Sequence, residues 1–135
     1  MSEQNLGRRV VVVVDDNEDD RFLARRMLKR VDPGVEIIEY AAADLALSDF
    51  VDDDRFAARF VGARPLLLLD INMPRMTGFE FLDELGEQRC ARIDVVILSA
   101  SDSPFDRERA ATYPAVVQCR EKPLTRSLIG ELLAL

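Results

Sequence analysis

Five polar residues come shortly after apolar runs of the sequence and could take part in one reaction. They are Asp15, Asp16, Asp70, Ser99 and Lys122. Three carboxylates brought close together repel one another, so they require a cation or a raised pKa. Carboxylate oxygens favour Mg²⁺ or Mn²⁺, with waters completing an octahedron. A carboxylate beside such an ion could attack phosphorus as a nucleophile, while a lysine and a hydroxyl group stabilise the phosphoryl oxygens.

Each of these residue types alone has a more common structural explanation. Acid pairs, single aspartates and single serines after a strand are most often caps or turn residues, and a single lysine is most often solvated. An EF-hand loop beginning at Asp15 is excluded, because Asp20 stands where glycine is needed and Arg26 where the bidentate glutamate belongs. The joint placement of the five residues after four different runs favours the functional interpretation.

The elements that position these residues follow from the apolar spacing. Runs without polar alternation predict buried strands at Val10–Val14, Val35–Ile38, Leu66–Leu69, Val95–Leu98 and Ala115–Cys119. Helical spacing, with Ser103 and Thr125 as N-caps of the last two helices, predicts helices over residues 19–31, 42–50, 78–85, 104–113 and from 126 onward. In the first helix Leu23, Met27 and Val31 recur at helical spacing, with Ala24 and Leu28 alongside, whereas segment 51–64 is ambiguous.

Alternating strands and helices predict an α/β fold, a doubly wound (βα)5 arrangement in which helices cover both faces of a five-stranded parallel sheet. Ligands of such folds bind beyond the carboxyl ends of the strands. The five polar residues are therefore expected to gather at one edge of the sheet.

Composition excludes several classes of function. The chain has 135 residues, 48% of them hydrophobic, and no histidine, which removes histidine bases and most transition-metal sites. A net charge of −7 argues against direct binding of nucleic acid. Val10–Val14 is too short to cross a membrane, and without a signal peptide the expected location is cytoplasmic. Cys90 and Cys119 form neither a disulfide framework nor a zinc motif.

The motifs around these residues resemble the receiver domain of response regulators over essentially the whole chain. The matching stretches are VVDD (Val13–Asp16), LLLLDINMPRMTGFEFL (Leu66–Leu82), VVILSAS (Val95–Ser101) and REKPLT (Arg120–Thr125). The resemblance implies a CheY-like, flavodoxin-like fold and a phosphorylation-controlled switch of a two-component system. Residues 1–135 are expected to form a single, stand-alone receiver domain without an output domain. A weaker resemblance, through the long segment before Pro65, is to the regulators that accompany bacterial phytochromes.

The resemblance implies specific roles for the acidic residues. Asp70 is expected to be the phospho-acceptor. Mg²⁺ is expected to be held by Asp15, Asp16, Asp70 and the backbone carbonyl of Asn72, with Asp16 as the direct ligand and Asp15 acting through water. Asn72 and Ser101 are expected to flank the path of the water that hydrolyses the phosphorylated state.

The remaining positions of the motif bind the phosphoryl group and respond to it. By resemblance, Lys122 pairs with a phosphoryl oxygen, and Pro123, after a cis bond, shapes the turn. Ser99 is the switch hydroxyl, beside the small Ala100. Cys119 stands where receivers usually carry a tyrosine or phenylalanine that turns inward. The signal is therefore expected to leave mainly through the loop after Ser99 and the helix that follows.

The resemblance also implies partners. A sensor histidine kinase or a histidine phosphotransfer protein donates the phosphoryl group, and an unknown downstream protein reads the signal. The first helix is expected to dock the donor through the basic side chains Arg21, Arg25, Arg26, Lys29 and Arg30. The sequence does not decide between a monomer and a homodimer.

Two other functions compete with this interpretation. An aspartyl-phosphate phosphatase needs a second acid two residues after its nucleophile, where this chain has Asn72. A degenerate receiver that binds partners without phosphorylation lacks one of the acids or the lysine, and all of them are present. The chain is expected to catalyse only its own phosphorylation and dephosphorylation.

Overall fold

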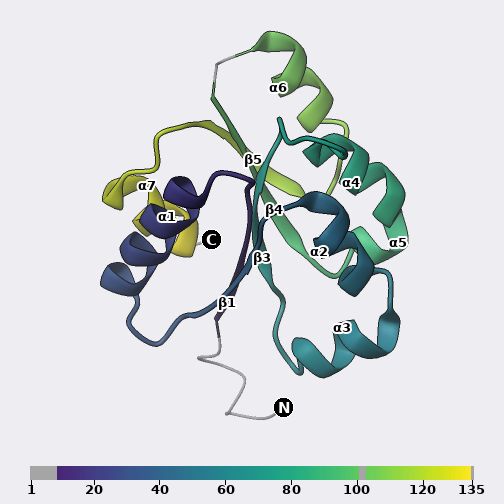
Figure 1. Cartoon of the computed structure of the whole chain (residues 1–135), viewed down its shortest axis with the longest axis horizontal. Helices are drawn as coiled ribbons and strands as arrows, with labels where there is room; N and C mark the ends of the chain where they lie inside the picture. Colours follow the sequence, from purple (N-terminus) through teal and green to yellow (C-terminus); the bar gives the residue numbers. More distant parts are fainter. Residues whose placement is uncertain (1–8, 101–102, 135) are drawn as a thin grey trace.

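A five-stranded parallel sheet forms the centre of the molecule, with helices on both faces (Figure 1). The computed structural model describes residues 9–100 and 103–134. The strands, in the spatial order β2-β1-β3-β4-β5, are β1 (Val10–Val14), β2 (Glu36–Tyr40), β3 (Leu66–Asp70), β4 (Asp94–Ser99) and β5 (Val116–Glu121). The predicted doubly wound fold is confirmed.

The helices of the described residues are α1 (Glu18–Val31), α2 (Ala43–Phe50), α3 (Asp53–Arg59), α4 (Gly78–Leu85), α5 (Glu87–Cys90), α6 (Pro104–Ala110) and α7 (Arg126–Leu133). Helices α1 and α7 cover one face of the sheet, and α2 to α6 contribute to the core on the other face (Figure 1). No helix in the described ranges is both long and apolar enough to span a membrane.

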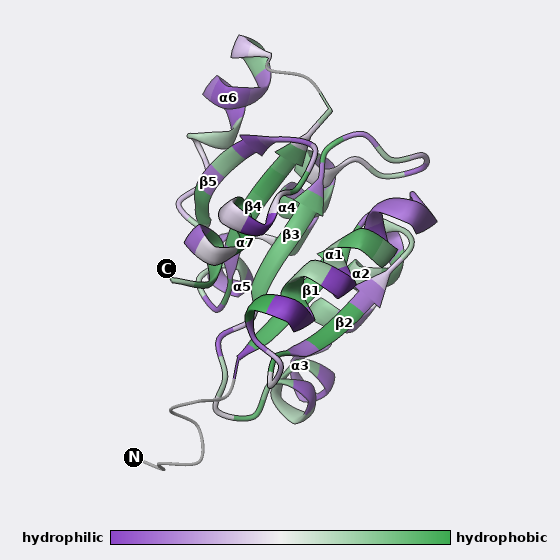
Figure 2. Cartoon of the chain, turned by 90° about the vertical axis from the view of Figure 1, so that its left-hand side faces the viewer, coloured by the Kyte–Doolittle hydropathy of each residue, from purple (hydrophilic) through white to green (hydrophobic). Residues whose placement is uncertain are grey.

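The central strands are apolar on both sides because each side faces a separate core. Val10, Val12 and Val14 pack into the core beneath α2 and α4, whereas Val11 and Val13 pack into the core beneath α1 and α7. Strands β3 and β4 alternate in the same way, and all three are green in the hydropathy view of Figure 2. This two-sided burial explains runs of valine and leucine without polar alternation.

The structure buries only part of the apolar stripe predicted for α1. Ala24 and Leu28 are the buried residues of the helix, whereas Leu23 is 48% exposed and Val31 is 39% exposed. The periodic apolar face is wider than the contact that α1 makes with the sheet and α7. Leu23 therefore belongs to the surface of the molecule.

Two short helices, α3 and α5, were not predicted. The ambiguous segment 51–64 holds α3, which begins at the cap Asp52 and packs Phe56 on Phe50, with the ring centroids 5.5 Å apart. Both helices are too short for their period to emerge from the sequence. The predicted caps Ser103 and Thr125 are confirmed.

Several predicted element bounds differ from those observed. Strand β2 begins at Glu36 and not at Val35, whose N–H closes a turn to the carbonyl of Asp32. Strand β5 begins at Val116 and runs on to Glu121, and α6 ends at Ala110. Such ends are set by hydrogen bonding between segments, which apolar spacing does not report.

Candidate functional site

The pleat of two neighbouring strands brings Asp15 and Asp70 to the same side of the sheet. The Asp15 N–H donates to the carbonyl of Tyr40 (3.1 Å), which extends the pairing of β1 by one residue. Asp70 is the last residue of β3, which pairs directly with β1. Each acid comes two residues after a side chain of the core beneath α1 and α7, namely Val13 and Leu68, so both acids face that side.

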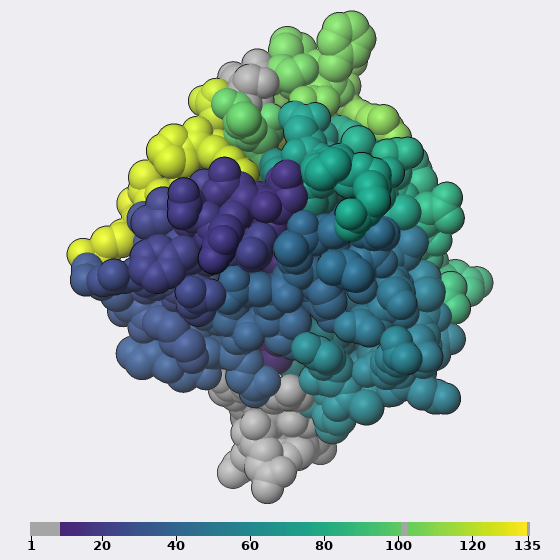
Figure 3. All heavy atoms as spheres, viewed as in Figure 1, coloured from purple at the N-terminus to yellow at the C-terminus, as the bar shows by residue number. Residues whose placement is uncertain are grey.

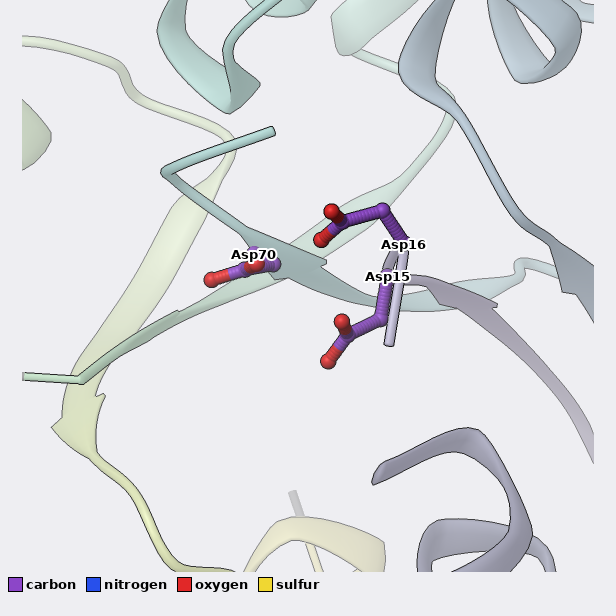
Figure 4. Close-up of side chains that lie close together, drawn as sticks. All are labelled: Asp15, Asp16 and Asp70. Carbon is purple, nitrogen blue, oxygen red and sulfur yellow. The ribbon is translucent and has the colours of Figure 1, made fainter. Parts of the chain in front are cut away.

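Asp15, Asp16 and Asp70 form one carboxylate cluster. One oxygen from each lies within 4.8 Å of the others, and Figure 4 shows the three side chains close together at the ends of β1 and β3. Asp15 is 4% exposed and Asp70 is 7% exposed, whereas Asp16 is open to solvent. The cluster thus combines two buried charges with one accessible charge.

Lys122 brings a positive charge to this cluster from the end of β5. Its backbone N–H donates to the carbonyl of Ser99 (2.7 Å), and the peptide bond to the following Pro123 is cis. Its ammonium Nζ lies 2.8 Å from Asp15 Oδ2 and 3.7 Å from Asp70 Oδ1. Asp70 is therefore close to the ammonium without a short hydrogen bond to it.

Burial and neighbouring charges together set the pKa values of Asp70 and Lys122. Desolvation raises the pKa of Asp70 to about 6, against the opposing effect of Lys122, and the charges of Asp15 and Asp16 raise it further. Burial alone lowers the pKa of Lys122, but its hydrogen-bonded carboxylates reverse the effect and hold that pKa above its usual value. The pKa of Asp70 therefore stays raised although the Lys122 ammonium lies 3.7 Å away.

The loop after Asp70 is fixed by backbone hydrogen bonds. The Ile71 N–H donates to the carbonyl of Leu98, and the Gly78 N–H donates back to the carbonyl of Ile71 (2.9 Å). Thr77 then caps α4 in a reciprocal capping box with Glu80. The exposed Asn72 lies within this closed loop, two residues beyond Asp70.

The structure places the predicted switch residues at the end of β4. Ser99 is 3% exposed, and the adjacent Ala100 is exposed. Ser99 and the half-buried Cys119 line one small cavity of about 10 Å³ beside α6. Ser101, the predicted flank of the water path, lies outside the described residues.

The sequence matches the response regulator receiver domain model over residues 11–133. The chain belongs to the response regulator receiver domain family. It is 35% identical to the two-component response regulator ARR17 of Arabidopsis thaliana, over 90% of this chain and 80% of that protein. A chemotaxis protein CheY4 structure from Vibrio cholerae superimposes with a TM-score of 0.74 at 24% identity, covering 95% of this chain and 98% of that one.

Receiver domains are phosphorylation-controlled switches that take their phosphoryl group from histidine kinases and signal to downstream partners. Some relatives of this receiver domain are longer proteins. A protein-glutamate methylesterase/protein-glutamine glutaminase of Anaeromyxobacter dehalogenans is 30% identical over 92% of this chain, which spans only 32% of that protein. The likeness to that protein therefore concerns its receiver portion.

The residues of this receiver domain fit the Mg²⁺ that receivers bind at an acidic pocket. All donors of the cluster are oxygens, and their mutual distances within 4.8 Å suit a small divalent ion. Lys122 opposes the raised pKa of Asp70 without cancelling it, because burial first and the charges of Asp15 and Asp16 next act in the other direction. Asp15, Asp16 and Asp70 are thus the side chains that would hold Mg²⁺ or Mn²⁺.

Two residues of α1 belong to the site and were missed from the sequence. Arg21 Nη1 donates to the backbone carbonyl of Asp15 (2.7 Å), and Asp20 Oδ2 lies 2.9 Å from Lys122 Nζ. From the sequence alone, Asp20 is considered only as a position of an excluded EF-hand loop, and Arg21 only as a base that docks the phosphoryl donor. Their contacts depend on how α1 packs against β1 and α7, which no local pattern reports.

Proposed function

We propose that Asp70 accepts a phosphoryl group from the phosphohistidine of a sensor kinase or a histidine phosphotransfer protein, and that the phosphorylated chain signals by contact with a downstream protein. The observation that carries this proposal is the position of the Asp70 carboxylate. It is buried at the end of β3, within a carboxylate cluster that suits Mg²⁺, and 3.7 Å from the Lys122 ammonium.

In this reaction one Asp70 oxygen attacks phosphorus. The new O–P bond forms as the N–P bond of phosphohistidine breaks, and the imidazole leaves with a proton from solvent. A bound Mg²⁺ supplies positive charge to the phosphoryl oxygens. Lys122 supplies a second positive charge, and Ser99 is the hydroxyl that turns toward the group. The backbone carbonyl of Asn72 would be a further ligand of the ion, and the side chain of Asn72 cannot act as the general acid of a phosphatase.

Acetyl phosphate with Mg²⁺ is expected to add one base-labile phosphoryl group to the wild-type protein, detected by intact mass and located on Asp70 by peptide mapping. Asp70→Asn is expected to abolish the label, because an amide cannot attack phosphorus. Asp19→Asn, which neutralises an exposed acid of the first turn of α1, is the matched control and should label normally. Undiminished labelling of Asp70→Asn would refute the proposed acceptor.

The surface of α1 supports contact with the phosphoryl donor. The side chains of Phe22, Leu23, Arg26 and Arg30 line a groove of about 230 Å³ together with Arg126 of α7. Phe22 is 45% exposed, and the guanidinium of Arg26 lies 5.6 Å from its ring centroid. Figure 3 shows α1, in purple and blue, at the surface beside the yellow C-terminal segment. Of the basic residues predicted for docking, Arg21 instead supports Asp15, and Arg25 pairs with Glu39.

Replacing Phe22 and Arg26 together by alanine is expected to slow transfer from a kinase about tenfold, because exposed aromatic and arginine side chains carry most contact energy. The donor is whichever autophosphorylated histidine kinase labels the wild-type protein fastest. Labelling by acetyl phosphate should be unchanged. Phe105→Ala removes an 83% exposed ring from α6 and is the control. Equal slowing with both donors would place the damage in the phosphorylation site.

A further inference from the structure

The ammonium of Lys122 is shared between the carboxylate cluster and helix α1. Its Nζ lies 2.8 Å from Asp15 Oδ2 and 2.9 Å from Asp20 Oδ2, but 3.7 Å from Asp70 Oδ1. The first two distances are hydrogen bonds, and the third is too long for one. Two of the three ammonium donors are thus engaged away from Asp70.

The position of Asp20 at a helix start has a common explanation, but that explanation does not cover the contact of its carboxylate with Lys122. Asp20 lies in the first turn of α1, where its charge favours the positive end of the helix. Glu18 and Asp19 of the same turn serve that end equally well, and both are exposed. Among these three acids, all within the described residues, Asp20 is the one whose carboxylate contacts Lys122. The favourable interaction of an acid with the helix N-terminus therefore does not explain the contact between Asp20 and Lys122.

We propose that Asp20 is a positioning residue that holds Lys122 toward α1 in the unphosphorylated state and competes with a phosphoryl group on Asp70 for its ammonium. This inference rests on the proposed role of Lys122 as the partner of the phosphoryl group. Asp15 stands beside Asp70 on a neighbouring strand, whereas Asp20 approaches the ammonium from the helix. Movement of Nζ toward Asp70 therefore lengthens the contact with Asp20 first.

The competition sets how firmly the protein holds the phosphorylated state. A phosphoryl group adds negative charge and strong acceptor oxygens at Asp70, and these draw the ammonium toward them. A contact that is made in one state and weakened in the other shifts the balance between the two states. Asp20 thus favours the unphosphorylated state and limits the affinity of the site for phosphoryl-like ligands.

The test compares binding of beryllofluoride, which mimics the phosphoryl group, at saturating Mg²⁺ by amide chemical-shift titration. Asp20→Asn is compared with Asp19→Asn, which removes the same charge from the same helical turn without contacting Lys122. We expect Asp20→Asn to bind about fivefold more tightly than Asp19→Asn, the scale of a partly exposed ion pair. Asp20→Glu keeps the charge and is expected to bind as the wild-type protein does.

A second readout follows the ammonium directly. In ¹⁵N spectra without beryllofluoride, the Lys122 ammonium protons should exchange faster in Asp20→Asn than in Asp19→Asn, because one short contact is lost. Equal or weaker beryllofluoride binding by Asp20→Asn, with unchanged ammonium exchange, would overturn this inference alone. A wild-type protein that binds no beryllofluoride would overturn the proposed function, and this inference with it.

Discussion

Replacing Gly78 by alanine is expected to destabilise the protein by about 2 kcal/mol and to slow phosphorylation at least tenfold. A Cβ at this position lies 2.5 Å from the backbone carbonyl oxygen of Asp70 and 3.2 Å from Leu69 Cγ. The nearest atom is backbone, so relief requires a shift of the chain that carries the acceptor. Urea unfolding and acetyl phosphate labelling measure the two effects.

Gly130 provides the matched control for this substitution. It lies within α7, and an added Cβ there would meet no atom within 4 Å apart from its chain neighbours and the backbone of its own helix. Gly130→Ala is therefore expected to stabilise the protein by about 0.5–1 kcal/mol, the usual gain from replacing glycine in a helix. Labelling should be normal. If Gly78→Ala were as stable and as active as Gly130→Ala, the close packing of the loop against Asp70 would be refuted.

Asp70→Asn is expected to raise the free energy of unfolding of the metal-free protein by about 2 kcal/mol at pH 7.5. Burial raises the pKa of Asp70 to about 6, so the folded state binds its proton more tightly than the unfolded chain does. The wild-type protein therefore loses stability as pH rises from about 4 to 6. The asparagine variant lacks this loss, so the gain should vanish near pH 4.

Urea unfolding in EDTA at both pH values tests this effect, and Mg²⁺ provides a further check. Because the ion neutralises the cluster, Mg²⁺ should raise the melting temperature of the wild-type protein more than that of Asp70→Asn. Asp19→Asn should show no gain at pH 7.5, since Asp19 lies outside the cluster. A metal-free Asp70→Asn protein that is less stable than wild type would contradict a crowded acidic site.

The sequence by itself determined where the strands lie along the chain and which polar residues stand at their carboxyl ends. Runs such as Val10–Val14 need burial on both faces, and this requirement is local enough to appear as an unbroken apolar run. Carboxyl ends of parallel strands meet at one edge of the sheet, so the sequence alone predicts that the acids at the ends of β1 and β3 lie together. The helix caps Ser103 and Thr125 could also be predicted from the sequence, because the backbone N–H that each one binds lies three residues away.

Tertiary structure decided which face of α1 is buried and which of its side chains enter the site. The periodic pattern did not distinguish the exposed Leu23 from the buried Leu28, since both are leucines on one broad stripe. Asp20 and Lys122 are 102 positions apart in sequence, and their contact depends on the packing that brings α1 close to the segment between β5 and α7. Sequence periodicity reports how a segment is folded locally, whereas contacts between distant segments are fixed by how the elements pack.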